Sequence, residues 1–159
     1  MAKGIVEADL GRIKTLLDGV LGHSDYSDVQ RMGGLTNRTY RVEFADGSRI
    51  MVRIPGEGTE EMIDRSDEKV STQLACKLGI DAKLYHFGDD GSKVSEFVPN
   101  AVTMCAETMR EDKRIRQAAR LLKKLHDCGE DTGIPFDVFD MAAGYEKIIR
   151  ENNVPMYDV

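Results

Sequence analysis

Two alternating runs joined by a short polar turn constrain the fold of this chain more than any other feature. Apolar side chains occupy every second position over residues 40–44 and again over residues 50–54. The residues between the runs are ADGS, and an Asp-Gly pair between two such runs is typical of a β-hairpin. The pattern therefore predicts an antiparallel hairpin with its turn at Asp46-Gly47.

The remaining periodicities extend this hairpin into a larger fold. Apolar residues at steps of three and four predict a helix over residues 6–22, and Val29 to Met32, just ahead of the two glycines, is counted as a strand. Asp64 is a candidate N-cap and Gly79 a candidate terminator of the helix between them. A second hairpin is expected from strands at 82–87 and 93–98 around DDGS. Further helices are predicted over residues 103–109, 111–127 and 140–152.

The order of these elements predicts an α+β fold. A strand-rich half is followed by a helical half, and the boundary is expected near Pro99, which with Asn100 interrupts the strand pattern. The 159 residues, 41% of them apolar, suffice for a real core. The sequence therefore predicts a five-stranded antiparallel sheet with helices, followed by a helical segment.

Charge and cysteine usage exclude several classes of protein. The chain carries 22 Lys and Arg against 28 Asp and Glu, a net charge of -6, which argues against binding to nucleic acid or to an anionic membrane. Cys76, Cys105 and Cys128 are far apart and form no zinc or disulfide pattern. The N-terminus contains acids instead of an apolar signal segment, so a cytoplasmic protein is expected.

Three features are candidates for chemistry. Arg53 shares a strand face with Met51, and its guanidinium offers paired donors suited to phosphate. Gly33 and Gly34 precede a strand, where backbone without Cβ can bend over an anion. Glu68, on the following helix, is placed to hold Arg53. Taken singly, each also fits a plain structural interpretation: an exposed arginine, an ordinary turn and a solvated helix face.

Taken as a series, these motifs resemble the bacterial choline kinase family. GGLTNRTYRV, VRIPGEGTEEMIDR, DEKVSTQLACKLGI and KVSEFVPNAVTM carry the resemblance, which runs from about Val29 to Gly129. The wider choline/ethanolamine kinase and aminoglycoside phosphotransferase group is more distantly similar. The resemblance implies the N-terminal lobe of a protein-kinase-like fold, with an ATP-binding lobe over residues 1–97, a hinge over 98–102 and the beginning of a helical lobe over 103–159.

The resemblance also implies roles for particular residues. The loop over the ATP phosphates would contain Gly33, Gly34, Thr36 and Asn37. Arg53 would contact phosphate, with Glu68 as its partner. The hinge residues Glu96, Phe97 and Val98 would hydrogen-bond the adenine edge through their backbone. His126, at the end of LLKKLH, is expected to be a packing or capping residue.

The catalytic residues of that family are not found in the sequence. The HxDxxxxN loop and the later metal-binding aspartate should follow the LLKKLH helix, whereas the one H-x-D match, His23-Ser24-Asp25, precedes the glycines. We therefore expect no catalytic and no metal-binding residue in this chain, with the Mg²⁺ ligands in a missing C-terminal part. Either a truncated kinase or a natural nucleotide- or partner-binding module fits, and truncation is favoured.

The expected substrates follow from the resemblance alone. They are ATP and a small amino alcohol, namely choline, with ethanolamine or an aminoglycoside as alternatives. The isolated chain is expected to be inactive. Its helix over residues 111–127 has an apolar stripe that would lack its usual cover, so a homodimer or larger species is expected.

Overall fold

The computed structural model describes residues 4–34, 36–59 and 63–153. Its centre is an antiparallel sheet of five strands in the order β1-β2-β3-β5-β4. The strands are β1 (Tyr26–Gly33), β2 (Asn37–Phe44), β3 (Arg49–Pro55), β4 (Leu84–Phe87) and β5 (Lys93–Glu96). The predicted five-stranded sheet and the α+β class are thus confirmed.

The two hairpins close with the same kind of three-residue loop. In the first, the amide of Phe44 donates to the carbonyl of Ser48 at 2.9 Å, and Gly47 has a positive φ of 81°. In the second, the amide of Gly88 donates to Ser92 at 2.8 Å, and Gly91 has a φ of 83°. Because this left-handed conformation is strained for residues with a Cβ, both loops place glycine there.

Helix α1 (Glu7–Leu21) covers one face of the sheet. Its buried residues Ile13 and Leu17 pack against the even-numbered apolar side chains of β2 and β3, which alternate with polar ones as the sequence predicts. The core consists of Ile13, Leu17, Val29, Tyr40, Val42, Phe44, Ile50, Val52, Ile54 and Val94. Each fully buried aliphatic side chain contributes about 1.5–3 kcal/mol, so this cluster holds α1 on the sheet.

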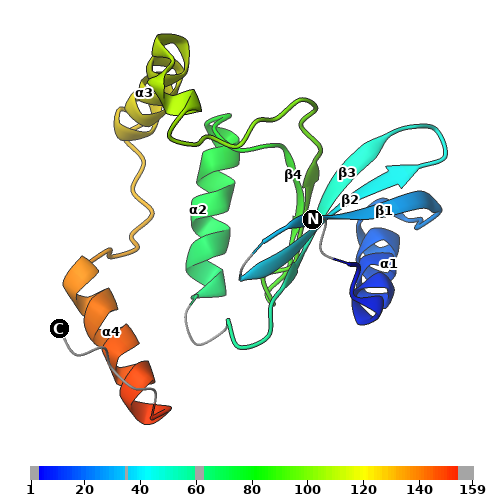
Figure 1. Ribbon diagram of the computed structural model, residues 1–159, viewed down its shortest axis with the longest axis horizontal. Helices are drawn as coiled ribbons and strands as arrows, with labels where there is room; N and C mark the ends of the chain where they lie inside the picture. The colour runs from blue at the N-terminus through cyan, green and yellow to red at the C-terminus, as the bar shows by residue number, and fades with distance from the viewer. Residues whose placement is uncertain (1–3, 35, 60–62, 154–159) are drawn as a thin grey trace.

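Helix α2 (Arg65–Lys77) lies beside the other face of the sheet, near β4 (Figure 1). Asp64 caps it as predicted, because its side chain accepts hydrogen bonds from the amides of Ser66 and Asp67 at 2.9 and 3.2 Å. Leu78 is the last, C-capping residue, and Gly79 follows with a φ of 63°. The cap fixes where α2 begins relative to the end of β3.

The segment after β5 begins beside the sheet and then leads away from it (Figure 1). It contains a 3₁₀ turn, η1 (Thr108–Arg110), and helices α3 (Asp112–His126) and α4 (Val138–Glu151). The helix predicted over residues 103–109 is wrong. The hydroxyl of Thr108 accepts from the amide of Cys105 at 2.8 Å and donates to its carbonyl at 3.1 Å, beside one backbone hydrogen bond of helical spacing, from the amide of Met109 to the carbonyl of Cys105 at 2.9 Å.

Within the described residues, no helix is long and apolar enough to cross a membrane. Residues 60–62 of the VRIPGEGTEEMIDR motif lie outside the described residues, as do residue 35 of the GGLTNRTYRV motif and both chain ends, 1–3 and 154–159. The proposed division into residues 1–97, 98–102 and 103–159 stays a prediction.

Candidate active site

The face of the sheet opposite α1 carries a row of polar side chains. The pairing register places Thr39 of β2 opposite Arg53 of β3, and Arg53 opposite Lys93 of β5. Met51 and Ser95 form the next row on the same face. Because alternate residues of a strand share a face, two cations are brought together at the centre of the sheet.

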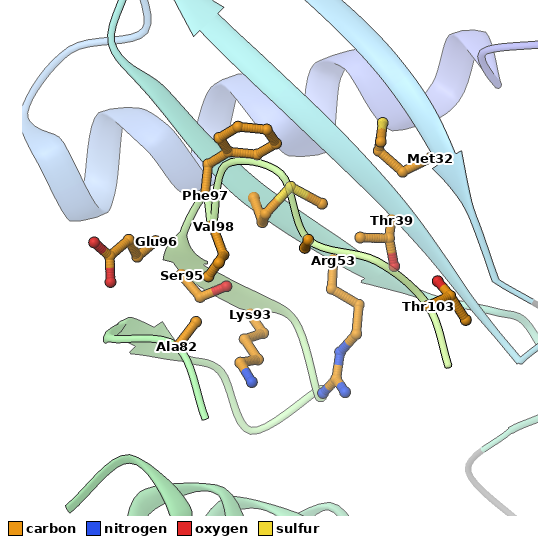
Figure 2. Close-up of a pocket in the computed structure, with 12 residues that line it drawn as sticks. Met32, Thr39, Arg53, Ala82, Lys93, Ser95, Glu96, Phe97, Val98 and Thr103 are labelled. Carbon is orange, nitrogen blue, oxygen red and sulfur yellow. The ribbon is translucent and has the colours of Figure 1, made fainter. Parts of the chain in front are cut away.

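A cavity of about 440 Å³ lies over these rows (Figure 2). The strands contribute Met32, Thr39, Met51, Arg53, Lys93 and Ser95, and the segment after β5 contributes Phe97, Val98, Ala101 and Thr103. Figure 2 shows the Arg53 and Lys93 side chains extending in the same direction, with Phe97 on the opposite side. One end of the cavity is thus cationic and the other is apolar.

Arg53 is held from three sides. Its Nη1 forms an ion pair with the carboxylate of Glu68 on α2, and its Nη2 donates to the carbonyl of Gly91 at 2.8 Å. The guanidinium carbon also lies 5.3 Å from the ring centre of Phe87, a cation–π distance. Among the described residues its buried Nε has no hydrogen-bond partner. The guanidinium is therefore fixed in direction while some of its five donors remain for another acceptor.

Glu68 binds two arginines at once. Its second carboxylate oxygen accepts from Nη1 of Arg65 at 2.7 Å, and Arg65 also donates to Thr59 at 2.6 Å. Burial by itself would raise the pKa of Glu68, but the hydrogen bonds from Arg53 and Arg65 outweigh it and hold the pKa below its usual value. The acid is therefore ionised at neutral pH, and two guanidinium groups around one carboxylate leave a net positive charge.

Lys93 is a cavity cation that sequence reasoning missed. Its Nζ donates to Asp81 at 2.7 Å, and its side chain is mostly covered. Lys93 lies directly opposite Arg53 in the sheet. Only the pairing of β3 with β5, which are not neighbours in sequence, reveals that opposition.

The predicted glycine loop lies between β1 and β2 rather than in the cavity wall. Gly33 and Gly34 have φ values of 138° and 110°, and a Cβ on Gly34 would stand 1.8 Å from the carbonyl oxygen of Asn37. The carbonyl of Thr36 accepts from the amide of Gly56 at 2.9 Å. Only a residue without a side chain fits at position 34, so the loop is tightly folded against the start of β2.

The nine predicted site residues fall into three groups. Four line the cavity, namely Arg53, Glu96, Phe97 and Val98. Glu68 meets the cavity through Arg53, whereas Gly33, Gly34, Thr36 and Asn37 form the neighbouring loop. The Glu96 side chain is exposed and points away from Arg53 in Figure 2. The amide of Glu96 donates to the carbonyl of Lys83 at 2.8 Å. The guanidinium carbon of Arg49 lies 5.8 Å from the ring centre of Phe97.

The five-stranded antiparallel sheet, with helices α1 and α2 and the segment that bounds the cavity, matches the N-terminal lobe of a protein-kinase-like fold. The family model for choline/ethanolamine kinase matches residues 29–154. The chain therefore belongs to the choline/ethanolamine kinase family.

Individual relatives agree with this placement. A probable ethanolamine kinase of Arabidopsis thaliana is 32% identical over 112 residues, which cover 68% of this chain and 29% of the plant protein. The crystal structure of the choline kinase LicA from Streptococcus pneumoniae matches with a TM-score of 0.75 and 27% identity, over 90% of this chain and 49% of LicA. LicA in complex with AMP matches with a TM-score of 0.71 and 28% identity, over 87% and 48%. The chain thus spans half or less of the length of these relatives.

Proposed function

We propose that this chain binds ATP in the cavity and is the nucleotide-binding part of a kinase that phosphorylates the hydroxyl of choline or a related amino alcohol. The observation that carries the proposal is Arg53, fixed by Glu68 and Gly91 at the cationic end of a cavity whose other end is the segment after β5. LicA, which is similar to this chain, forms a complex with AMP, and this supports nucleotide binding.

In this proposal Arg53 contacts phosphate oxygens. A guanidinium already oriented by a carboxylate and a carbonyl loses little further freedom when an anion arrives, so its hydrogen bonds to phosphate add to affinity. Lys93 supplies a second positive charge on the neighbouring strand, directly opposite Arg53. The tight loop from Gly33 to Asn37 would contribute backbone amides to the same phosphates.

The hinge would bind the base. The amide of Glu96 is already engaged by Lys83, so the backbone donors for an adenine edge must come from Phe97 and Val98. The ring of Phe97 and the side chain of Met51 offer the apolar contacts that a flat base requires. The apolar end of the cavity is therefore assigned to adenine and the cationic end to the phosphates.

Phosphoryl transfer needs more than these residues. A magnesium ion would neutralise charge on the transferring phosphate, but among residues 4–34, 36–59 and 63–153 no three His, Cys, Asp or Glu side chains come together to hold a metal. The sequence also has no HxDxxxxN loop after α3. We therefore assign no catalytic step to these residues and propose that the isolated chain does not transfer phosphate.

The acceptor is assigned by family. Choline is favoured by the similarity to LicA, and ethanolamine by the similarity to the Arabidopsis protein; an aminoglycoside is a more distant alternative.

A noncatalytic binding module is the second candidate function, and the exposed apolar side chains of α3 and α4 favour it. Incubation of the chain with ATP, Mg²⁺ and each acceptor, followed by mass spectrometry, should give no phosphorylated product.

Titration calorimetry with ATP tests the binding proposal. Arg53→Ala should weaken ATP binding by about tenfold to a hundredfold, since a hydrogen bond to a charged group contributes about 1.5–3 kcal/mol. Arg116→Ala is the matched control, because Arg116 is an exposed arginine on α3. Equal affinities of the wild type and Arg53→Ala would remove the phosphate role of Arg53.

A further inference from the structure

Helix α1 contains a buried carboxylate, that of Asp9, which has no role in the proposed ATP site so far. The side chain of Asp9 is 1% exposed and faces the sheet. Arg38 donates two hydrogen bonds to the Asp9 carboxylate, from Nε at 2.5 Å and from Nη2 at 2.8 Å. The hydroxyl of Tyr40 donates a third at 2.5 Å. A buried charge without partners costs several kcal/mol, so this one is satisfied by a dedicated set of donors.

The charge on Asp9 is maintained at neutral pH. Burial would raise the pKa of Asp9, but the hydrogen bonds from Arg38 and Tyr40 outweigh burial and hold the pKa below its ordinary value. In the same cluster, burial and the nearby carboxylate raise the pKa of Tyr40. Tyr40 therefore remains a neutral donor and Asp9 an ionised acceptor at neutral pH.

The contact reaches the base of the glycine loop. Arg38 is the second residue of β2, directly after Asn37, whose carbonyl oxygen lies where a side chain on Gly34 would stand. On the far side the loop is tied to the end of β3 by the hydrogen bond between Thr36 and Gly56. Asp9 therefore holds the start of β2 through Arg38, directly next to the residue that contacts Gly34.

The same turn of α1 also contacts the loop between β4 and β5. Arg12, three residues after Asp9, donates to Asp90 at 3.1 Å. Asp90 precedes Gly91, whose carbonyl accepts the Nη2 of Arg53. Both partners of the Arg12 pair are about half exposed, and such a pair contributes little energy. Asp9 is therefore the main connection and Arg12 a minor one.

We propose that Asp9 is a positioning residue for phosphate binding, acting through Arg38 on the loop between β1 and β2. The inference rests on the proposed ATP site and adds to it a helix that precedes the matched segment, which begins at residue 29. Asp9 touches no ligand. It holds the strand start that carries the loop, so its removal should affect the phosphates of a nucleotide and not the base.

Comparison of the affinities for ATP and for adenosine separates a positioning role of Asp9 from a general loss of folded structure. Calorimetry on the whole chain should show that Asp9→Asn weakens ATP binding by about tenfold, equivalent to about 1.4 kcal/mol, while adenosine binding changes less than about twofold. Asp18→Asn is the matched control: it removes the same charge from the exposed side of α1 and should change neither affinity. Equal weakening for both ligands, or no weakening, would overturn the inference.

A second variant covers the case in which Asp9→Asn does not fold. Arg38→Lys keeps the charge but loses the paired geometry, and it should show the same ATP-selective loss to a smaller extent. A wild type that binds ATP no more tightly than adenosine would overturn the proposed function, and this inference with it. A wild type with phosphate selectivity that both variants retain would overturn the inference alone.

Discussion

The sheet half and the helical segment after it differ in how far their apolar side chains are buried. The core around β2, β3 and α1 includes side chains that are fully buried, such as Ile54 and Leu17. Helices α3 and α4 contain no buried residue, and Leu122 and Phe139 are 56% and 83% exposed. Since stability comes mainly from burial of apolar surface, the first half is stabilised by its own core, whereas the second gains stability only when another surface covers it.

The largest expected effect concerns this difference directly. Ile54→Ala should lower the free energy of unfolding by about 2–4 kcal/mol, because it removes a buried side chain and leaves a cavity. Leu122→Ala, the matched change on α3, should lower it by less than about 0.5 kcal/mol. Urea denaturation followed by circular dichroism measures both. Similar losses for the two variants would mean that α3 is packed as well as β3.

A second effect concerns association. Exposed apolar side chains on α3 and α4 favour contact between copies, so sedimentation velocity should detect species larger than a monomer. Leu122→Lys should weaken this association by about tenfold or more, the equivalent of losing one buried leucine. Val70→Lys, at an exposed apolar position on α2, is the control and should have little effect. A wild-type monomer at every concentration would exclude the association.

Acid should weaken the sheet half in particular. The folded-state pKa values of Asp9 and Glu68 are both lowered, so their contribution to stability is complete above the unfolded pKa, about 4, and is lost as the pH falls through the folded values. The urea midpoint should therefore decrease below about pH 4. The decrease should be smaller in Asp9→Asn and unchanged in Asp18→Asn. A midpoint independent of pH would contradict the burial of these ion pairs.

The regular elements could be predicted from the sequence because their signals are local. Alternation over residues 40–44 and 50–54 identifies the central hairpin, and Asp64 identifies the start of α2. The error at residues 103–109 has a local cause too: a segment this short gains too few hydrogen bonds to offset helix nucleation. Side-chain bonds between Thr108 and Cys105 then prevail.

The site could be predicted only in part. Arg53 and Glu68 were identified as a pair, since helix and strand follow each other closely. Asp9 was missed because it occupies an apolar face of α1 and its partners, Arg38 and Tyr40, lie far along the chain. Lys93 was missed because its position depends on the pairing of β5 with β3. Long-range contacts of this kind leave no periodic trace in a single sequence.

The central claim is that the guanidinium of Arg53 binds nucleotide phosphate, and nuclear magnetic resonance tests it most directly. The Nε–H signal of Arg53, assigned by its loss in Arg53→Lys, should shift on addition of ATP and remain in place with equimolar adenosine. Because Nε belongs to the guanidinium whose remaining donors would bind the phosphate, its signal should shift with the change in charge and hydrogen bonding around that group. An Nε–H signal that stays in place at saturating ATP, with shifts confined to residues 112–151, would contradict the claim.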